Sequence, residues 1–122
     1  MRESGYTDER AVPHAAFGRD VMQRLTERGY MPQELPVNGD QPDIAIHDPF
    51  RNRKAYVDPK TRYGRSQEYA VKCGSLETYW LLTLKGTPVY VVWSPAFTVD
   101  TVYTLSARIA TGPLRPTRKG SK

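Results

Sequence analysis

Apolar residues recur at helical spacing after a polar N-terminal stretch. Phe17, Val21 and Leu25 follow one another at steps of four residues, which is typical of a helix that buries one face. This pattern begins at His14, and Gly29 is a natural helix stop. The sequence therefore predicts a first helix from His14 to Gly29.

A second helix is expected between Ser75, a plausible N-cap, and Gly86, a plausible stop. Its apolar stripe consists of Leu76, Tyr79, Trp80 and Leu84. At this spacing the aromatic residues are interpreted as core, like Trp93, and not as a platform for stacking bases.

Short apolar runs bounded by turn residues predict strands. Prolines leave room for a short strand within residues 30–37, and a second strand runs through Ile44 and Ile46. A turn at residues 51–53 then leads into a returning strand at residues 54–58. Residues 66–73 fit either a helix start or a short extended piece.

Two further strands are expected towards the C-terminus. Residues 89–93 are dense in strand-forming residues, as a buried strand should be, and residues 101–105 suggest an edge strand. The predicted fold is one α/β domain, with a mixed β-sheet flanked by helices. We expect a flexible arm at 1–12, the domain at 13–111 and a basic, disordered tail at 112–122.

Length and composition narrow the class of protein. The 122 residues suffice for one core, and 39% are hydrophobic. There is no apolar run of the about 20 residues that a membrane-spanning helix needs. The N-terminus lacks a signal-peptide core, and Cys73 is the single cysteine, which excludes an intrachain disulfide. A cytoplasmic protein is the expectation.

The positive charge is concentrated in two windows of a chain whose formal net charge is +5. Residues 51–65 and 108–122 hold 11 of the 18 basic residues and one of the 13 acidic residues. A polyanion such as nucleic acid is the partner expected for such a surface. A solvated basic surface without a partner would show the same clustering.

Residues 42–60 hold the most informative chemistry. Asp43 stands at the head of one predicted strand, and Asp58 and Lys60 close the next. Residues two apart in a strand share a face, and one hairpin can bring Asp43 to them. Two carboxylates, with the carbonyl of Pro59, can hold Mg²⁺, and the lysine can assist phosphodiester hydrolysis.

The stretch resembles the PD-(D/E)XK nuclease superfamily. The signature of that family is Pro-Asp, an interval, then Asp or Glu, any residue and Lys, and here it is formed by Pro42-Asp43 and Asp58-Pro59-Lys60. The surrounding elements resemble the αβββαβ restriction-endonuclease-like core over residues 14–94. Pro59 departs from the usual pattern, because it cannot donate to a sheet ladder, so pairing should fail on one side there or a bulge should form.

The resemblance implies a nuclease dependent on Mg²⁺ or Mn²⁺ that hydrolyses phosphodiester bonds of DNA, with RNA as the less expected substrate. Asp43 and Asp58 would bind the metal, Pro59 would add its carbonyl, and Lys60 would assist the attacking water. Members often carry a further acid on the first helix. Asp20 is the best positional match, with Glu27 as runner-up, and a solvated helix acid is the alternative for each.

Structure-directed cutting in repair, recombination or phage DNA processing fits the absence of a visible sequence-reading element. Basic residues beside the motif, with one tyrosine among them, are the expected nucleic-acid contacts: Arg51, Arg53, Lys54, Arg62, Tyr63 and Arg65. A chain this small covers little substrate, so a homodimer or a partner chain is expected.

Two other functions remain open at this stage. The domain would be a nucleic-acid-binding or partner-binding module that keeps the fold without activity, or a structural subunit of a larger complex. His47 is interpreted as a solvated residue at a strand end, His14 as a residue at a helix start, and Cys73 as a small buried residue.

Overall fold

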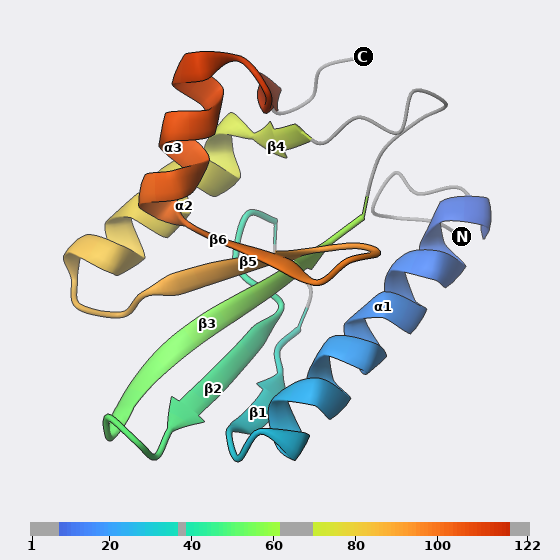
Figure 1. The fold of residues 1–122 in the computed structure, drawn as a ribbon, viewed down its shortest axis with the longest axis vertical. Helices are drawn as coiled ribbons and strands as arrows, with labels where there is room; N and C mark the ends of the chain where they lie inside the picture. Colours follow the sequence, from blue (N-terminus) through green and yellow to red (C-terminus); the bar gives the residue numbers. More distant parts are fainter. Residues whose placement is uncertain (1–7, 37–38, 62–69, 118–122) are drawn as a thin grey trace.

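A five-stranded sheet lies between one helix on one face and two helices on the other (Figure 1). The structure is a computed structural model, and it describes residues 8–36, 39–61 and 70–117. Its elements, in chain order, are α1 (Asp8–Glu27), β1 (Met31–Glu34), β2 (Ile44–Asp48), β3 (Arg53–Lys60), β4 (Ala70–Lys72), α2 (Cys73–Leu84), β5 (Val89–Trp93), β6 (Thr98–Thr101), α3 (Val102–Thr111) and β7 (Arg115–Thr117).

The strand order is β1-β2-β3-β5-β6. The first three strands form an antiparallel meander, β5 lies parallel to β3, and β6 returns antiparallel to β5. The chain reaches β5 from β3 by a crossover that contains α2, as a parallel pair requires. The predicted mixed sheet with its αβββαβ core is confirmed.

Side chains along each strand point alternately to the two faces of the sheet, and each face carries its own apolar core. On one face, Phe17 and Val21 of α1 pack against Ile44, Val57 and Val92 of the sheet. On the other face, Val91 and Trp93 lie under α2 and α3 and contact a second cluster made of Val71, Tyr79, Val89, Val102, Leu105 and Leu114. Residues at odd and even positions of β3 therefore belong to different layers.

Helix α1 begins earlier than the apolar pattern predicted. It starts at Asp8, inside the stretch expected to be a flexible arm, so His14 lies within the helix and not at its start. Residues 1–7 lie outside the described part of the chain. Gly29 has a φ of 91°, which confirms it as the residue where the chain leaves the helix.

The predicted edge strand at residues 101–105 is wrong, because this segment forms the first turn of α3. The Thr101 hydroxyl accepts from the Thr104 backbone N–H, and the Thr104 hydroxyl accepts from the Thr101 N–H. This capping box outweighs the strand preference of Val102, Tyr103 and Thr104. The edge of the sheet is β6 instead.

The predicted tail at 112–122 contributes to the domain over its first residues. Leu114 is buried in the α2/α3 core, and β7 pairs in parallel with β4. The expectation of a tail without core contacts is therefore wrong up to Thr117, and residues 118–122 lie outside the described range. Strand β4 also settles the ambiguous segment at 66–73 as extended at residues 70–72.

Helix α2 starts two residues before the predicted N-cap. Lys72 is the N-cap and makes no side-chain cap bond, while the Ser75 hydroxyl donates to Asp40 at 3.1 Å. A Cβ on Gly74 would overlap the same Asp40 carboxylate, so glycine permits this close approach. Asp40 thus ties the loop before β2 to the start of α2.

Across the described residues, none of the helices is both long enough and apolar enough to cross a membrane.

Candidate active site

The pairing of β2 with β3 brings the two predicted metal-binding acids to neighbouring positions. Ile44 pairs with Val57, Asp43 precedes Ile44, and Asp58 follows Val57. The Asp43 carbonyl accepts from the Leu35 backbone N–H at 2.8 Å, so the chain is still held in the sheet at this residue. One strand end of the hairpin therefore carries both carboxylates.

Pro59 lies where its missing N–H costs no ladder bond. Tyr56 donates its backbone N–H to Pro88, and the Lys60 carbonyl accepts from Ser94, so even-numbered residues of β3 bond to the β5 side. Pro59 therefore turns its nitrogen and carbonyl to the other side, where the register with β2 has ended at Val57. The expectation that pairing fails on one side of Pro59 is confirmed.

Asp58 is buried and held by two groups of the protein. Lys60 Nζ lies 3.2 Å from Asp58 Oδ2, and the Tyr79 hydroxyl of α2 donates to the same oxygen. Lys60 Nζ also lies 5.9 Å from the centroid of the Tyr79 ring. The acid and lysine of the motif thus project from one face of β3 onto one aromatic residue.

Tyr79 is protonated and serves as a hydrogen-bond donor. Burial raises its pKa far above the usual range, and the negative charge of Asp58 raises it further. The sequence pattern assigned Tyr79 only to the apolar stripe of its helix, and its side chain is indeed buried. Its role beside Asp58 was not foreseen, although a hydroxyl on a buried stripe needs a polar partner.

His14 is a second neighbour of the acids that sequence reasoning missed. Its Nε2 lies 3.7 Å from Asp43 Oδ2, and 37% of the Asp43 side chain is exposed. The signal was available, because His14 precedes Phe17 by three residues and so shares the sheet-facing side of α1. The first helix therefore offers an imidazole to this site.

The structure does not bring Asp20 to these groups. It is exposed and lies six residues beyond His14, which is about 9 Å along the helix. Glu27 is exposed too, and it accepts a hydrogen bond from Gln23 at 3.2 Å near the far end of α1. Neither acid of the first helix is placed as the resemblance implied.

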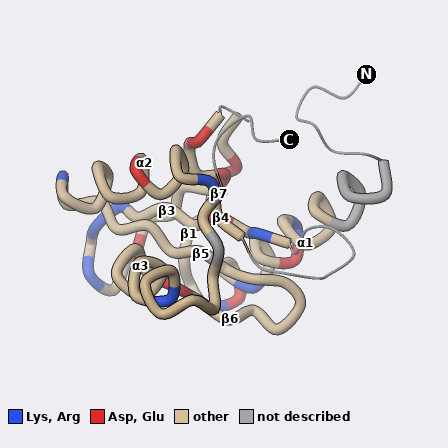
Figure 2. Tube along the Cα trace, turned by 90° about the horizontal axis from the view of Figure 1, so that it is seen from above, with Lys and Arg blue, Asp and Glu red and all other residues tan. Residues whose placement is uncertain are grey.

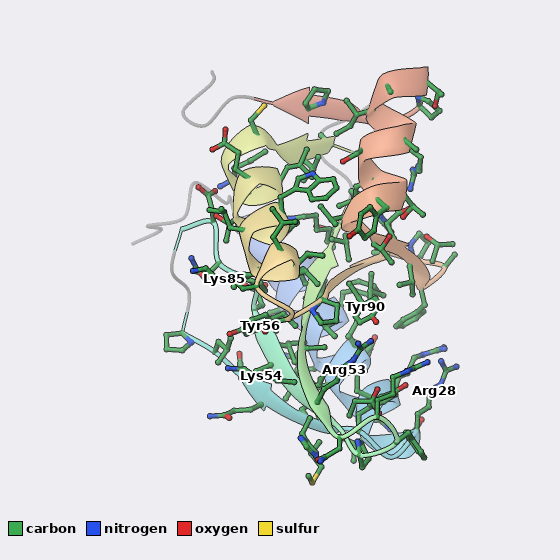
Figure 3. All side chains as sticks on the ribbon, turned by 90° about the vertical axis from the view of Figure 1, so that its left-hand side faces the viewer. Arg28, Arg53, Lys54, Tyr56, Lys85 and Tyr90 are labelled. Atoms are coloured by element: carbon green, nitrogen blue, oxygen red, sulfur yellow. The ribbon has the colours of Figure 1, made fainter. Side chains whose placement is uncertain are left out.

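The described basic residues of the motif region lie away from the acids. Arg51 is in the β2–β3 turn and Arg53 begins β3, at the end of the hairpin opposite Asp58. Lys54 is four residues, or about 13 Å, from Asp58. Figure 3 shows that Arg53 and Arg28 point to one side of the sheet, and Lys54, Tyr56 and Lys85 to the other.

The expectation of positive charge gathered around the site therefore fails for Arg51, Arg53 and Lys54. Figure 2 shows both basic and acidic positions at several places along the described trace. The remaining expected contacts, Arg62, Tyr63 and Arg65, lie outside the described residues.

Two minor candidates are also placed. His47 is half-buried in β2, four residues from Asp43, and pairs with Lys54. Cys73 is exposed at the first residue of α2, so the prediction of a buried cysteine is wrong.

Comparison with known proteins supports the fold assignment. The structure is similar to that of Hjc, a Holliday junction resolvase from the archaeal hyperthermophile Archaeoglobus fulgidus, with a TM-score of 0.58. The match covers 75% of this chain and 78% of the resolvase, at 20% sequence identity. This likeness is one of fold, and it agrees with the restriction-endonuclease-like core expected from the sequence. No family model and no curated protein matches the sequence.

The family that the sequence resembles implies a divalent metal, and the donor types at the hairpin end fit one. Mg²⁺ prefers oxygen ligands and binds through one or two carboxylates together with water and substrate phosphate. Asp43 and Asp58 supply carboxylates. The Pro59 carbonyl points to the side of β3 where pairing with β2 has ended. Among the described residues no group of three His, Cys, Asp or Glu side chains is placed to hold a metal, so these residues contribute at most this pair with a carbonyl.

Proposed function

We propose that this protein is a metal-dependent nuclease that hydrolyses phosphodiester bonds of DNA. One observation carries the proposal: Asp43, Asp58 and Lys60 come from adjacent positions at one end of the β2–β3 hairpin. The likeness to a Holliday junction resolvase supports a role in recombination or repair and makes a four-way junction the first substrate to test.

The acidic and basic residues of the site would have different roles. Asp43 and Asp58 would hold Mg²⁺ or Mn²⁺, with the Pro59 carbonyl beside them, and the bound ion would lower the pKa of a water and polarise the phosphate. The Lys60 side chain is 16% exposed and places its ammonium group next to Asp58. It would neutralise charge that develops on the phosphate or orient the attacking water.

The test is cleavage of a panel of substrates with Mg²⁺ or Mn²⁺. The panel contains a four-way junction, a fork, duplex DNA, single-stranded DNA and RNA. We expect Asp58→Ala and Lys60→Ala to lose at least about 100-fold in rate. Glu34→Gln, an exposed acid on β1, is the matched control and should cleave normally. Metal-dependent cleavage that persists in both site variants would contradict the assignment.

A nucleic-acid-binding module without activity is the second candidate. It is favoured by the enclosure of Asp58, which is 5% exposed, and by the absence of a three-acid group among the described residues. Binding of the same panel without cleavage, unchanged by a chelator, would identify this function.

Cleavage of both sides of a junction would need two copies of the site. Symmetric dimers are the commonest oligomers, and a homodimer would supply the second copy. Light scattering at two protein concentrations distinguishes it from a monomer, and a mass equal to that of one chain at both concentrations would exclude it.

A further inference from the structure

The environment of Asp58 is asymmetric between its two carboxylate oxygens. Oδ2 receives the Tyr79 hydroxyl, and Lys60 Nζ lies 3.2 Å from the same atom. The tyrosine belongs to α2 and the lysine to β3, and both lie on the face of the sheet that carries the α2/α3 core. The carboxylate is thus fixed through one oxygen.

The geometry points to Tyr79 as a positioning residue of the proposed site. Its hydroxyl and the Lys60 ammonium occupy Oδ2 of Asp58, so that Oδ1 is the atom presented to the metal ion. This inference rests on the proposed function, because it assigns the orientation of a ligand in that same site.

Three observations make Tyr79 suited to this role. Its side chain is 1% exposed and packs in the α2/α3 core, so the ring has little freedom to move. The helix that carries it is fixed at its start by the Ser75–Asp40 hydrogen bond to the loop before β2. The ring also lies beneath the Lys60 ammonium, with 5.9 Å between the nitrogen and the ring centroid.

A tyrosine at this place therefore acts on both members of the motif. The hydroxyl orients the acid, and the ring face stabilises the lysine by a cation–π contact. Groups that hold a metal ligand in this way govern its orientation, and their loss costs about 10-fold to 100-fold in metal affinity or activity.

Substitution of Tyr79 by Phe separates the two contributions. Tyr79→Phe removes the hydroxyl with its bonds to Asp58 and Lys60, and it keeps the ring, the core packing and the ring contact with Lys60. Tyr103→Phe is the matched control, because Tyr103 on α3 is 60% exposed and its ring contacts Trp80 at a centroid distance of 5.1 Å. Circular dichroism confirms that each full-length variant is folded.

The first measurement is calorimetric titration with Mn²⁺ alone, without nucleic acid. We expect the Kd for Mn²⁺ to rise about 10-fold in Tyr79→Phe and to stay at the wild-type value in Tyr103→Phe. An unchanged Kd in Tyr79→Phe would overturn the assignment. A lower Kd would overturn it too, because it would show that the hydroxyl competes with the metal for Oδ2.

The second measurement is cleavage of the best substrate of the panel. We expect kcat to fall about 10-fold in Tyr79→Phe while KM is unchanged, because Tyr79 acts on Asp58 and not on the DNA. A rise in KM at constant kcat would overturn the positioning role. A wild-type protein that binds Mn²⁺ but cleaves nothing contradicts the proposed function alone, and the Mn²⁺ affinities then decide for Tyr79. A wild-type protein that binds no Mn²⁺ overturns both.

Discussion

Two buried aspartates lie in one row across the sheet and are held in nearly the same way. Asp58 of β3 pairs with Val91 of β5, and Val91 pairs with Asp100 of β6. Asp58 is bound by Tyr79 and Lys60, whereas Asp100 is bound by Trp93, whose indole nitrogen lies 2.8 Å from Oδ2, and by Arg108. Each acid therefore has one aromatic donor and one cation on a single oxygen.

The surroundings of the two aspartates explain why one is a candidate for chemistry and the other is structural. Asp100 connects β6 to α3 through its ion pair with Arg108. Asp58 directly follows Val57, the last residue of β3 that pairs with β2, and Asp43 directly precedes its partner Ile44. Both acids are thus buried and paired with a cation. Asp58 differs in its position, next to Asp43 in the strand register and next to the point where pairing with β2 ends.

The largest effects are expected from changing each aspartate to Asn. Asp58→Asn should lower the cleavage rate at least about 100-fold, because a ligand charge is lost. Asp100→Asn should leave the activity of the folded protein unchanged but lower the free energy of unfolding by about 2 kcal/mol, because a buried charged hydrogen bond is lost. Cleavage assays and urea unfolding of both variants measure this. Equal losses of activity would remove the distinction between the two acids.

A smaller effect is expected from a change at the start of α2, which carries the donor to Asp58. Gly74→Ala would force the Asp40 carboxylate away, since a Cβ would overlap Oδ2 and lie 3.0 Å from Cγ. The loss of the Ser75–Asp40 hydrogen bond should cost about 1 kcal/mol of stability. It should also reduce cleavage, because α2 then holds Tyr79 less firmly.

Gly18→Ala on α1 is the control for that substitution, because nothing lies within 4 Å of its added Cβ. Urea unfolding of the two variants compares their stabilities. A Gly74→Ala protein as stable as Gly18→Ala and as active as the wild type would show that the Asp40 contact does not position α2.

The smallest effect concerns a third buried acid, which has no motif partner. Burial alone would raise the pKa of Asp48, but hydrogen bonds from the Arg51 and Phe50 backbone N–H groups, with the Arg51 side chain, hold it below its usual value. A lowered pKa means that ionised Asp48 stabilises the fold above the pKa of the unfolded chain, about 3.9. That contribution is lost as the pH falls through the folded pKa.

Asp48→Asn should therefore be less stable than the wild type at pH 7, and the difference should narrow below about pH 4. Urea unfolding at pH 7, 5 and 3 measures it. A difference that stays constant over this range would show that the charge of Asp48 does not contribute. Its cleavage activity should be normal, because Asp48 lies at the opposite end of β2 from Asp43.

The sequence predicted the order of the central elements because their signals are local. The stripe of Phe17 and Val21 and the strand-forming run at residues 89–93 each determine one element without help from distant residues. Thr101 and Leu114 were misinterpreted for the opposite reason. A capping box turned a strand-like segment into α3, and Leu114 is buried only because β7 finds β4.

The sequence also predicted only some of the residues of the candidate site. Asp43, Asp58 and Lys60 stood out by motif spacing, and the hairpin register puts Asp43 and Asp58 at neighbouring strand positions. Tyr79 and His14 were hidden because each lies on a helix stripe whose periodicity indicates only burial. The basic residues were expected near the acids because they are close in sequence. A strand is extended, however, so residues four or five positions apart in β3 lie far apart in space.

Pro59 has a consequence for what can approach β3 from the side that β2 leaves. A strand that extended β2, or one from another chain, would find no N–H to bond at this residue. Ladder growth across the carboxylates is therefore interrupted at that point, and the unpaired stretch is a poor template for aggregation by strand addition. The residue that departs from the usual motif thus ends the ladder between β2 and β3 next to Asp58.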